Sequence, residues 1–245
     1  MLNHQNQEPV SPKRVVLIGG ASFIGSAVAQ QLEGKTTVLS LGRANVDLTA
    51  DGAANKLAGF LKADDAVVAI SAQAPCRNVD DFLVNAEIIK TLTKALEQQP
   101  VAHLVNISSD AVYPDEPVPL SEAVPAAPTS MHGAMHLARE IALRGLSIPM
   151  ATLRPTLVYG DSDPHNGYGP NQFRRKANKN EPITLFGEGE ERRDHVLVDD
   201  VAELVVRVLF SGSTGVLNAA TGTVTTFKEV AEKAVTLSGQ TVEIN

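Results

Sequence analysis

Two patterns of apolar and polar positions alternate along the chain. Short runs rich in Val, Ile and Leu predict strands buried on both faces of a sheet at residues 14–18, 36–41, 66–71, 101–109 and 150–156. Amphipathic stretches between them predict helices at residues 26–33, 53–63, 79–98 and 130–144. Strands that alternate with helices favour parallel pairing through right-handed crossovers. We therefore expect an α/β, Rossmann-like fold with a doubly wound parallel sheet.

The pattern changes after residue 160. Residues 161–189 are rich in Gly, Pro and Asn, so we expect them to leave the main sheet for a small, reduced second lobe. Residues 195–210 then predict a strand and a helix, with Asp199 or Asp200 as the helix N-cap. The expected organisation is a flexible tail over 1–13, a main domain over 14–160, and a second lobe over 161–245 from which a segment at about 191–220 returns to the main domain.

Composition and charge limit the kinds of partner that the chain can bind. The chain has 245 residues, 43% of them hydrophobic, and a net charge of -7. An acidic chain whose only basic cluster is Arg174 to Lys176 predicts no nucleic-acid or anionic-membrane partner. No apolar run approaches the ~20 residues that a membrane helix needs. The single cysteine, Cys76, excludes an intrachain disulfide and favours a reducing cytoplasm.

The stretch VVLIGGASFIG indicates a nucleotide site. A buried strand runs into glycines and then a helix, so that a pyrophosphate can approach the backbone and meet the helix N-terminus. Serine stands where a further glycine would complete the usual pattern. The alternative is a glycine turn without a cofactor. We expect the turn to bind a dinucleotide through Gly19, Gly20, Ser22, Phe23, Ile24 and Gly25.

The end of the second predicted strand bears on the choice of dinucleotide. NAD sites usually place a carboxylate there to hold the ribose hydroxyls. The segment VLSLGR has none, and Arg43 can pair with a 2′-phosphate. The sequence thus favours NADP over NAD, unless Arg43 points to solvent.

Two histidines, His132 and His136, are spaced to share one helix face. Such a pair can bind a metal, exchange a proton, or have no role. Gly133 occupies the position where the zinc motif H-E-x-x-H needs its glutamate, and the sequence identifies no further ligand.

Several motifs together resemble one family along nearly the whole chain. GGASFIG, NVDLT, NISSDAVYP, PTSMHGAMHLARE, TLRPTLVYG, PITLFGEGEERRDHVLVDDVAELV and LNAATG occur in the order seen in extended short-chain dehydrogenases/reductases, the NAD(P)-dependent nucleotide-sugar epimerase/dehydratase family. The chain is shorter than most members, which implies a reduced substrate lobe. The resemblance implies a nucleotide-sugar ligand and a homodimer paired through the two long helices.

The resemblance also assigns positions. It implies cofactor contacts from Asp47 and Leu48 near the adenine and from Ser71, Ala72 and Gln73 beside a ribose. It implies substrate contacts from Ser109, Asp110 and Arg193. Ala111 stands where sugar dehydratases carry a glutamate base, which argues against 4,6-dehydratase chemistry.

One departure is central. The family carries Y-x-x-x-K where this chain has His132 and His136. A histidine can transfer a proton near neutrality without the help of a lysine, but its side chain is shorter. Three hypotheses remain: an atypical oxidoreductase or epimerase with Ser109, His132 and His136 as catalytic residues; a nucleotide-binding or nucleotide-sugar-binding sensor or partner subunit without hydride chemistry; and a metal site on the two histidines.

Overall fold

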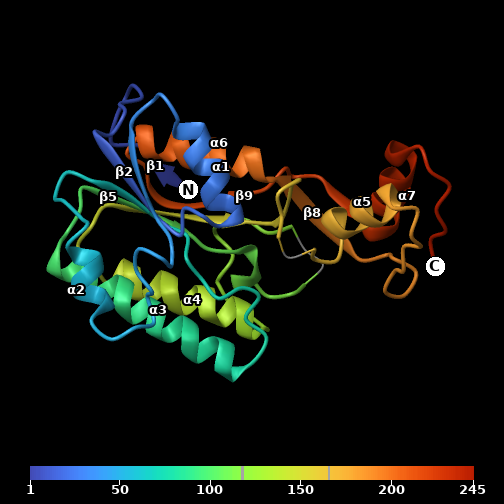
Figure 1. Ribbon diagram of the computed structural model, residues 1–245, viewed down its shortest axis with the longest axis horizontal. Helices are drawn as coiled ribbons and strands as arrows, with labels where there is room; N and C mark the ends of the chain where they lie inside the picture. Colours follow the sequence, from blue (N-terminus) through green and yellow to red (C-terminus); the bar gives the residue numbers. More distant parts are fainter. Residues whose placement is uncertain (117–118, 165) are drawn as a thin grey trace. The chain divides into compact units, whose positions relative to one another are not determined.

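The chain is described here by a computed structural model covering residues 1–116, 119–164 and 166–245 (Figure 1). It forms two compact units. The first unit comprises Met1–Pro155 and Asp199–Ala219, and the second comprises Thr156–Val198 and Ala220–Asn245. The division after Pro155 comes earlier than the expected boundary at residue 160, because β6 ends there. The returning segment is also shorter than expected, beginning at Asp199 rather than near residue 191.

The first unit is built on a mostly parallel sheet, as predicted. Among the described residues its strand order is β1-β9-β6-β5-β4-β2-β3, and only the β1–β9 pair is antiparallel. The strands are β1 Leu2–Asn3, β2 Arg14–Ile18, β3 Thr37–Leu41, β4 Ala66–Ala69, β5 His103–Ile107, β6 Met150–Pro155 and β9 Thr214–Ala219.

Helices cover both faces of this sheet (Figure 1). One face carries α1 (Phe23–Leu32) and α6 (Val198–Phe210), and the other carries α2 (Ala53–Ala58), α3 (Val79–Gln98) and α4 (Met131–Arg144). The doubly wound α/β fold is confirmed. Helix α3 has the predicted bounds, whereas α2 ends at Ala58 instead of reaching residue 63.

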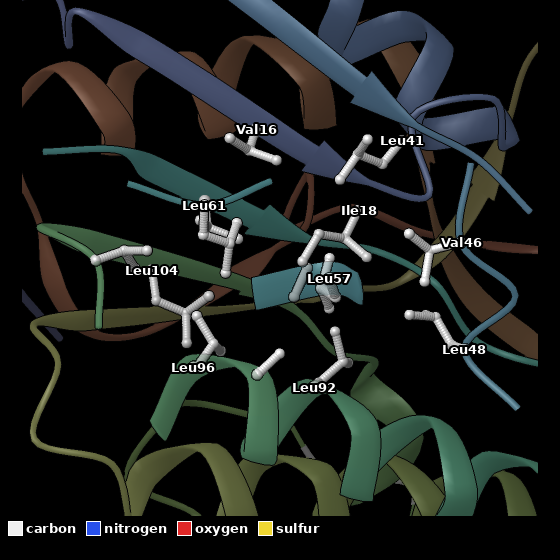
Figure 2. Packing of buried hydrophobic residues seen from close by; sticks show 14 of the residues in the cluster. Val16, Ile18, Leu41, Val46, Leu48, Leu57, Leu61, Leu92, Leu96 and Leu104 are labelled. Carbon is white, nitrogen blue, oxygen red and sulfur yellow. The ribbon is translucent and has the colours of Figure 1, made fainter. Parts of the chain in front are cut away.

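Buried aliphatic side chains join the sheet to α2 and α3 (Figure 2). Val16, Ile18 and Leu104 project from the strands, while Leu92 and Leu96 meet them from α3. Each fully buried side chain of this size contributes about 1.5–3 kcal/mol relative to an exposed one. This packing fixes the ends of β2 and β4 and so the place of the loops that follow them.

The topology defines where a ligand can bind. Strand β2 pairs with β3 on one side and with β4 on the other, so the winding direction reverses between β2 and β4. In such sheets ligands bind beyond the carboxyl ends of the strands at this switch point. Gly19 follows β2 and Ile70 follows β4 at this position.

The N-terminal residues differ from the expected loose tail. Leu2 and Asn3 pair with β9, the His4 Nδ1 atom lies 2.8 Å from the Ser213 Oγ atom, and Asn6 donates to the carbonyl of Phe210 at 2.8 Å. A short added strand covers the otherwise open edge of β9. The polar sequence concealed this because the contacts are backbone pairs and side-chain hydrogen bonds.

Helix ends follow local sequence signals with one exception. Asn78 caps α3 and Ser130 caps α4 through their side-chain oxygens. Asp199 and Asp200 were expected as caps but lie inside the first turn of α6. At these positions the two carboxylates stabilise α6 through their favourable interaction with the positive end of the helix dipole.

The second unit has its own sheet and core. Among its described residues the strand order is β10-β8-β7, from β7 Leu157–Tyr159, β8 Arg192–Leu197 and β10 Val224–Thr226. Helices α5 (Pro170–Asn178) and α7 (Phe227–Ser238) pack around Phe173, Ile183 and Phe227. Across the described residues of both units, no helix is long and apolar enough to cross a membrane.

Candidate functional site

The glycine turn after β2 is held by backbone hydrogen bonds. The Gly19 and Gly20 N–H groups donate to the Leu41 carbonyl at 2.8 and 3.3 Å, and the Ser22 N–H donates to the Gly19 carbonyl at 3.0 Å. Gly19 has a φ of 96°, which favours glycine. The turn thus leads directly into the N-terminus of α1, as predicted.

The glycines are required by close packing. A β-carbon on Gly19 would lie 2.7 Å from the Ser71 Oγ atom, one on Gly20 would overlap the Ser40 Oγ atom, and one on Gly25 would overlap the Gly19 carbonyl. The glycines thus let the start of α1 pack against the turn, and a helix N-terminus in this position favours an anion such as pyrophosphate. Phe23 and Ile24 form the first turn of the helix, and Ser22 is its N-cap, accepting from the Gly25 N–H at 3.2 Å.

The segment after β3 brings Arg43 and Asp47 together. The Arg43 Nε atom donates to the Asp47 carboxylate at 3.1 Å. Hydrogen bonds from Thr49, and then from Arg43, lower the pKa of Asp47 to about 2. Leu48 is buried in the hydrophobic core. The arginine that led us to favour NADP therefore already has an anionic partner.

The loop after β4 is also fixed beside the turn. The Ser71 N–H donates to the Ile18 carbonyl at 3.0 Å. The buried Asn85 side chain accepts from the Gln73 N–H and donates to the Gln73 carbonyl, both at 2.9 Å. Ala72 lies between these two anchored residues. The predicted cofactor residues of both loops are thus adjacent at the switch point.

The first turn of α4 closely approaches a short 3-10 helix, η1 (Asp110–Val112). A β-carbon on Gly133 would overlap the Ala111 carbonyl, so glycine permits this approach. Ser109 accepts from the Ala111 N–H at 3.1 Å and donates to Asp110 at 3.3 Å. The predicted residues Ser109 and Asp110 therefore lie close to the histidine helix.

His132 has a defined hydrogen-bond partner. The Cys76 backbone N–H donates to the His132 Nδ1 atom at 3.4 Å. A neutral imidazole that accepts at Nδ1 carries its proton on Nε2. Burial also lowers the pKa of His132. The contact and the burial together favour a neutral His132 ring with its proton on Nε2.

His136 lies deeper in the same helix. Its side chain is 6% exposed, and its ring centroid lies 4.7 Å from that of His132 in an edge-on arrangement. Burial, followed by the proximity of His132 and Arg139, holds the pKa of His136 well below its usual range. The two histidines therefore form a neutral, edge-on pair.

A metal is not favoured at this pair. Within residues 1–116, 119–164 and 166–245, no group of three or more His, Cys, Asp or Glu side chains is placed to hold an ion. A helix pair alone offers fewer ligands than a zinc site needs. The metal hypothesis has no support from the described residues.

Arg193 belongs to the second unit, on β8. Its guanidinium forms an ion pair with Glu191 at 2.5 Å, and its side chain is 40% exposed. The basic cluster noted in the sequence lies on α5, where Arg174 pairs with Asp161 at 2.6 Å. Both observations fit solvated ion pairs of low individual stability.

Comparisons with known proteins agree with this geometry. Residues 15–220 match the model of the NAD dependent epimerase/dehydratase family. The chain belongs to this family. It is 31% identical to UDP-glucose 4-epimerase from Mycolicibacterium smegmatis, over 89% of this chain and 80% of that protein. It is 28% identical to dTDP-glucose 4,6-dehydratase from Neisseria gonorrhoeae, over 83% and 71%.

A solved structure of the family supports the same assignment. The chain superposes on Thermus thermophilus UDP-glucose 4-epimerase, solved in complex with NAD, with a TM-score of 0.83 and 27% identity, over 95% of this chain and 85% of that one. The predicted family resemblance and fold are thereby confirmed. The roles of individual site residues stay predictions.

One buried charged residue beside the candidate site was not predicted from the sequence. Arg139 is 1% exposed and donates to the carbonyls of Ala69 and Ser71, at the carboxyl end of β4. It follows His136 by three positions, so helical spacing alone placed it on the histidine face. The sequence analysis also gave no role in the site to Cys76, whose backbone N–H donates to His132.

The buried histidines predict acid sensitivity. Burial lowers the pKa of His103 and of His136 below the ordinary 6.5, so the unfolded chain binds more protons than the folded one once the pH falls below about 6.5. The free energy of unfolding is highest above this pH and decreases as the pH falls. Each histidine contributes a decrease of up to about 1.4 kcal/mol per pH unit. Urea unfolding between pH 8 and 5 measures this, and His136→Phe is expected to flatten the slope. A flat wild-type profile contradicts the prediction.

Proposed function

We propose that the protein binds a nicotinamide dinucleotide at the glycine turn and a nucleotide sugar beside it, with strongly weakened proton transfer. The observation that carries this proposal is the hydrogen bond from the Cys76 N–H to His132 Nδ1. It is the second of the three hypotheses raised by the sequence, a binding protein in which hydride chemistry is slow or lost.

Dinucleotide binding is supported by the glycine cradle. The glycines let the turn pack closely against β3, the loop after β4 and the start of α1, whose N-terminus favours a pyrophosphate, and the loop from Ser71 to Gln73 is anchored beside it. The bound nicotinamide would accept and return a hydride. The residues of this chain hold the dinucleotide and the nucleotide sugar in place.

We favour NAD over NADP. The sequence favoured NADP through Arg43, but the Asp47 carboxylate pairs with this arginine and would repel a 2′-phosphate. The Thermus thermophilus relative was solved with NAD. An affinity for NADP at least equal to that for NAD overturns this preference.

A nucleotide sugar is the ligand class that the relatives favour. The named relatives act on UDP-glucose and dTDP-glucose. In this chain we assign the sugar contacts to Ser109 and Asp110, and a phosphate contact to Arg193. Ser109 can donate only by giving up its bond to Asp110, so sugar contact there replaces an existing hydrogen bond.

The tautomer of His132 limits proton transfer. With Nδ1 occupied by an N–H donor, Nε2 offers a hydrogen bond but lacks a lone pair to take a proton. The charged form would place an N–H on Nδ1, facing the Cys76 N–H. His132 can thus orient a hydroxyl or carbonyl oxygen without exchanging its proton.

An active epimerase or oxidoreductase is the second candidate. It is favoured by the low pKa of His132, which keeps the ring in the neutral form that a general base needs. Base action at Nε2 requires the opposite tautomer and the loss of the Cys76 hydrogen bond. Ser109 and His136 would then complete the catalytic set.

Calorimetric titration with NAD, NADP and UDP-glucose, followed by turnover of UDP-glucose, tests the proposal. We expect NAD and UDP-glucose to bind, and His132→Ala to change any turnover less than twofold, as in the control His4→Ala. A fall of about 10²- to 10⁴-fold in His132→Ala supports the second candidate instead. The absence of dinucleotide binding overturns both.

We further propose a cytoplasmic homodimer. Val79 and Leu83 on α3 and Ile141 on α4 are 63%, 57% and 58% exposed, so the two long helices carry apolar side chains that a second copy can cover. The single buried cysteine fits a reducing compartment. Sedimentation of a monomer, unchanged by Leu83→Glu, contradicts the dimer.

A further inference from the structure

Arg139 is a fully buried cation on the histidine helix. Its Nη1 atom donates to the Ser71 carbonyl at 3.0 Å, and its Nη2 atom donates to the Ala69 carbonyl. Burial lowers its pKa to about 10, so the guanidinium is still charged at neutral pH. A buried charge is costly unless it is well partnered, which makes this residue an unusual choice for packing alone.

No carboxylate is dedicated to this charge among the described residues. The adjacent Glu140 carboxylate accepts from Ser108 at 2.6 Å and from the Arg154 Nε and Nη2 atoms at 3.0 and 2.7 Å. Arg139 therefore relies on two carbonyl oxygens at the end of β4, and its Nε atom is buried without a hydrogen-bond partner.

These carbonyls belong to the dinucleotide site. Ser71 packs against Gly19, where a β-carbon would already be 2.7 Å from its Oγ atom. The Ile70 and Ser71 N–H groups donate to the Ile18 carbonyl at 2.9 and 3.0 Å, immediately before the glycine turn. Arg139 thus connects α4 to both loops at the switch point through one residue.

The same charge lies beside the histidine pair. On α4, Arg139 and His132 both disfavour a proton on His136. From the loop before α3, Cys76 contacts His132 through its backbone N–H. On the sheet side, Glu140 is bound to Arg154 of β6. Burial and the charge of Arg139 therefore both act against a proton on His136.

We propose that Arg139 is a positioning residue that clamps the end of β4 for the dinucleotide and adds a buried positive charge one helical turn from His136. The part of this proposal that concerns dinucleotide binding rests on the proposed function. The guanidinium sets where the Ser71–Gln73 loop meets the ligand, and its charge adds to burial in disfavouring a proton on His136.

Arg139→Met and Arg144→Met form a matched pair on one helix. The Arg144 side chain is 58% exposed, whereas Arg139 is buried. Arg144→Met therefore removes a positive charge from the same helix but leaves the hydrogen bonds of Arg139 to β4 intact. We expect Arg139→Met to weaken NAD binding about tenfold or more, since two charge-assisted hydrogen bonds are lost, and Arg144→Met to leave it within twofold. Circular dichroism confirms that both variants are folded.

Histidine titration followed by NMR gives a readout that packing alone does not move. We expect the pKa of His136 to rise in Arg139→Met and to stay unchanged in Arg144→Met. If Arg139→Met does not fold, Arg139→Lys replaces it, because lysine retains the positive charge but not the paired N–H groups of the guanidinium. We expect Arg139→Lys to weaken NAD binding and to leave the histidine titration unchanged.

Either readout unchanged in folded Arg139→Met overturns the proposal, as does a lowered NAD affinity of equal size in Arg144→Met. If the wild type binds no dinucleotide, the proposed function fails. The histidine titration still tests the charge effect of Arg139 in that case.

Discussion

Replacing Glu140 with alanine is expected to lower the free energy of unfolding by about 3–5 kcal/mol, as found when one partner of a buried ion pair is removed. The carboxylate is wholly buried and accepts from Ser108 and twice from Arg154. Arg154 also donates to the Tyr113 hydroxyl at 2.8 Å. Without Glu140, the Arg154 guanidinium is left buried between the helix and the sheet with too few acceptors.

Urea unfolding at pH 7 measures this loss. Glu203→Ala is the matched control, because Glu203 on α6 pairs with Arg207 at an exposed i,i+4 position and is expected to cost less than about 1 kcal/mol. A similar, small loss in Glu140→Ala would show that the buried pair does not hold α4 to the sheet.

Replacing Gly25 with alanine is expected to weaken dinucleotide binding about 10²-fold. The added β-carbon would overlap the Gly19 carbonyl, which is backbone and cannot rotate away, so α1 must move from the glycine turn. A displacement of about 1 Å in a positioned site can cost a factor of this size. Calorimetry with NAD measures it on the folded variant.

Gly59→Ala is the control for this substitution. Gly59 follows α2 with a φ of -64°, and the nearest atom to an added β-carbon is 3.4 Å away. Alanine is tolerated there, so NAD affinity should stay within twofold. Equal affinity in Gly25→Ala and wild type would remove the support that the glycine cradle gives to the cofactor proposal.

The sequence predicted the main sheet well because burial on both faces leaves a strong apolar signal. Runs such as 14–18 and 66–71 contain little else, and α3 carries a clear stripe and an Asn78 cap. The N-terminal pairing escaped because Leu2 and Asn3 form only two residues of strand. Its partners lie more than two hundred positions away, which no local pattern encodes.

In the candidate site, too, features with a local sequence motif were predicted and features that depend on distant contacts were not. The glycine turn is a local motif and was found, as was the likeness of the chain to the epimerase family. The state of His132 depends on a backbone N–H from Cys76, and a backbone group has no residue signature. The preference for NADP was drawn from Arg43 without its partner Asp47, because Asp47, four positions along, was assigned separately to the adenine.

The tight contact at Gly133 also restricts what this helix can become. A glutamate between the two histidines would supply the residue that the zinc motif H-E-x-x-H lacks. Its β-carbon would overlap the Ala111 carbonyl, so α4 would first have to separate from η1. A single substitution therefore cannot convert the histidine helix into a metalloprotease-like one, because the close contact between Gly133 and Ala111 leaves no room for the added side chain.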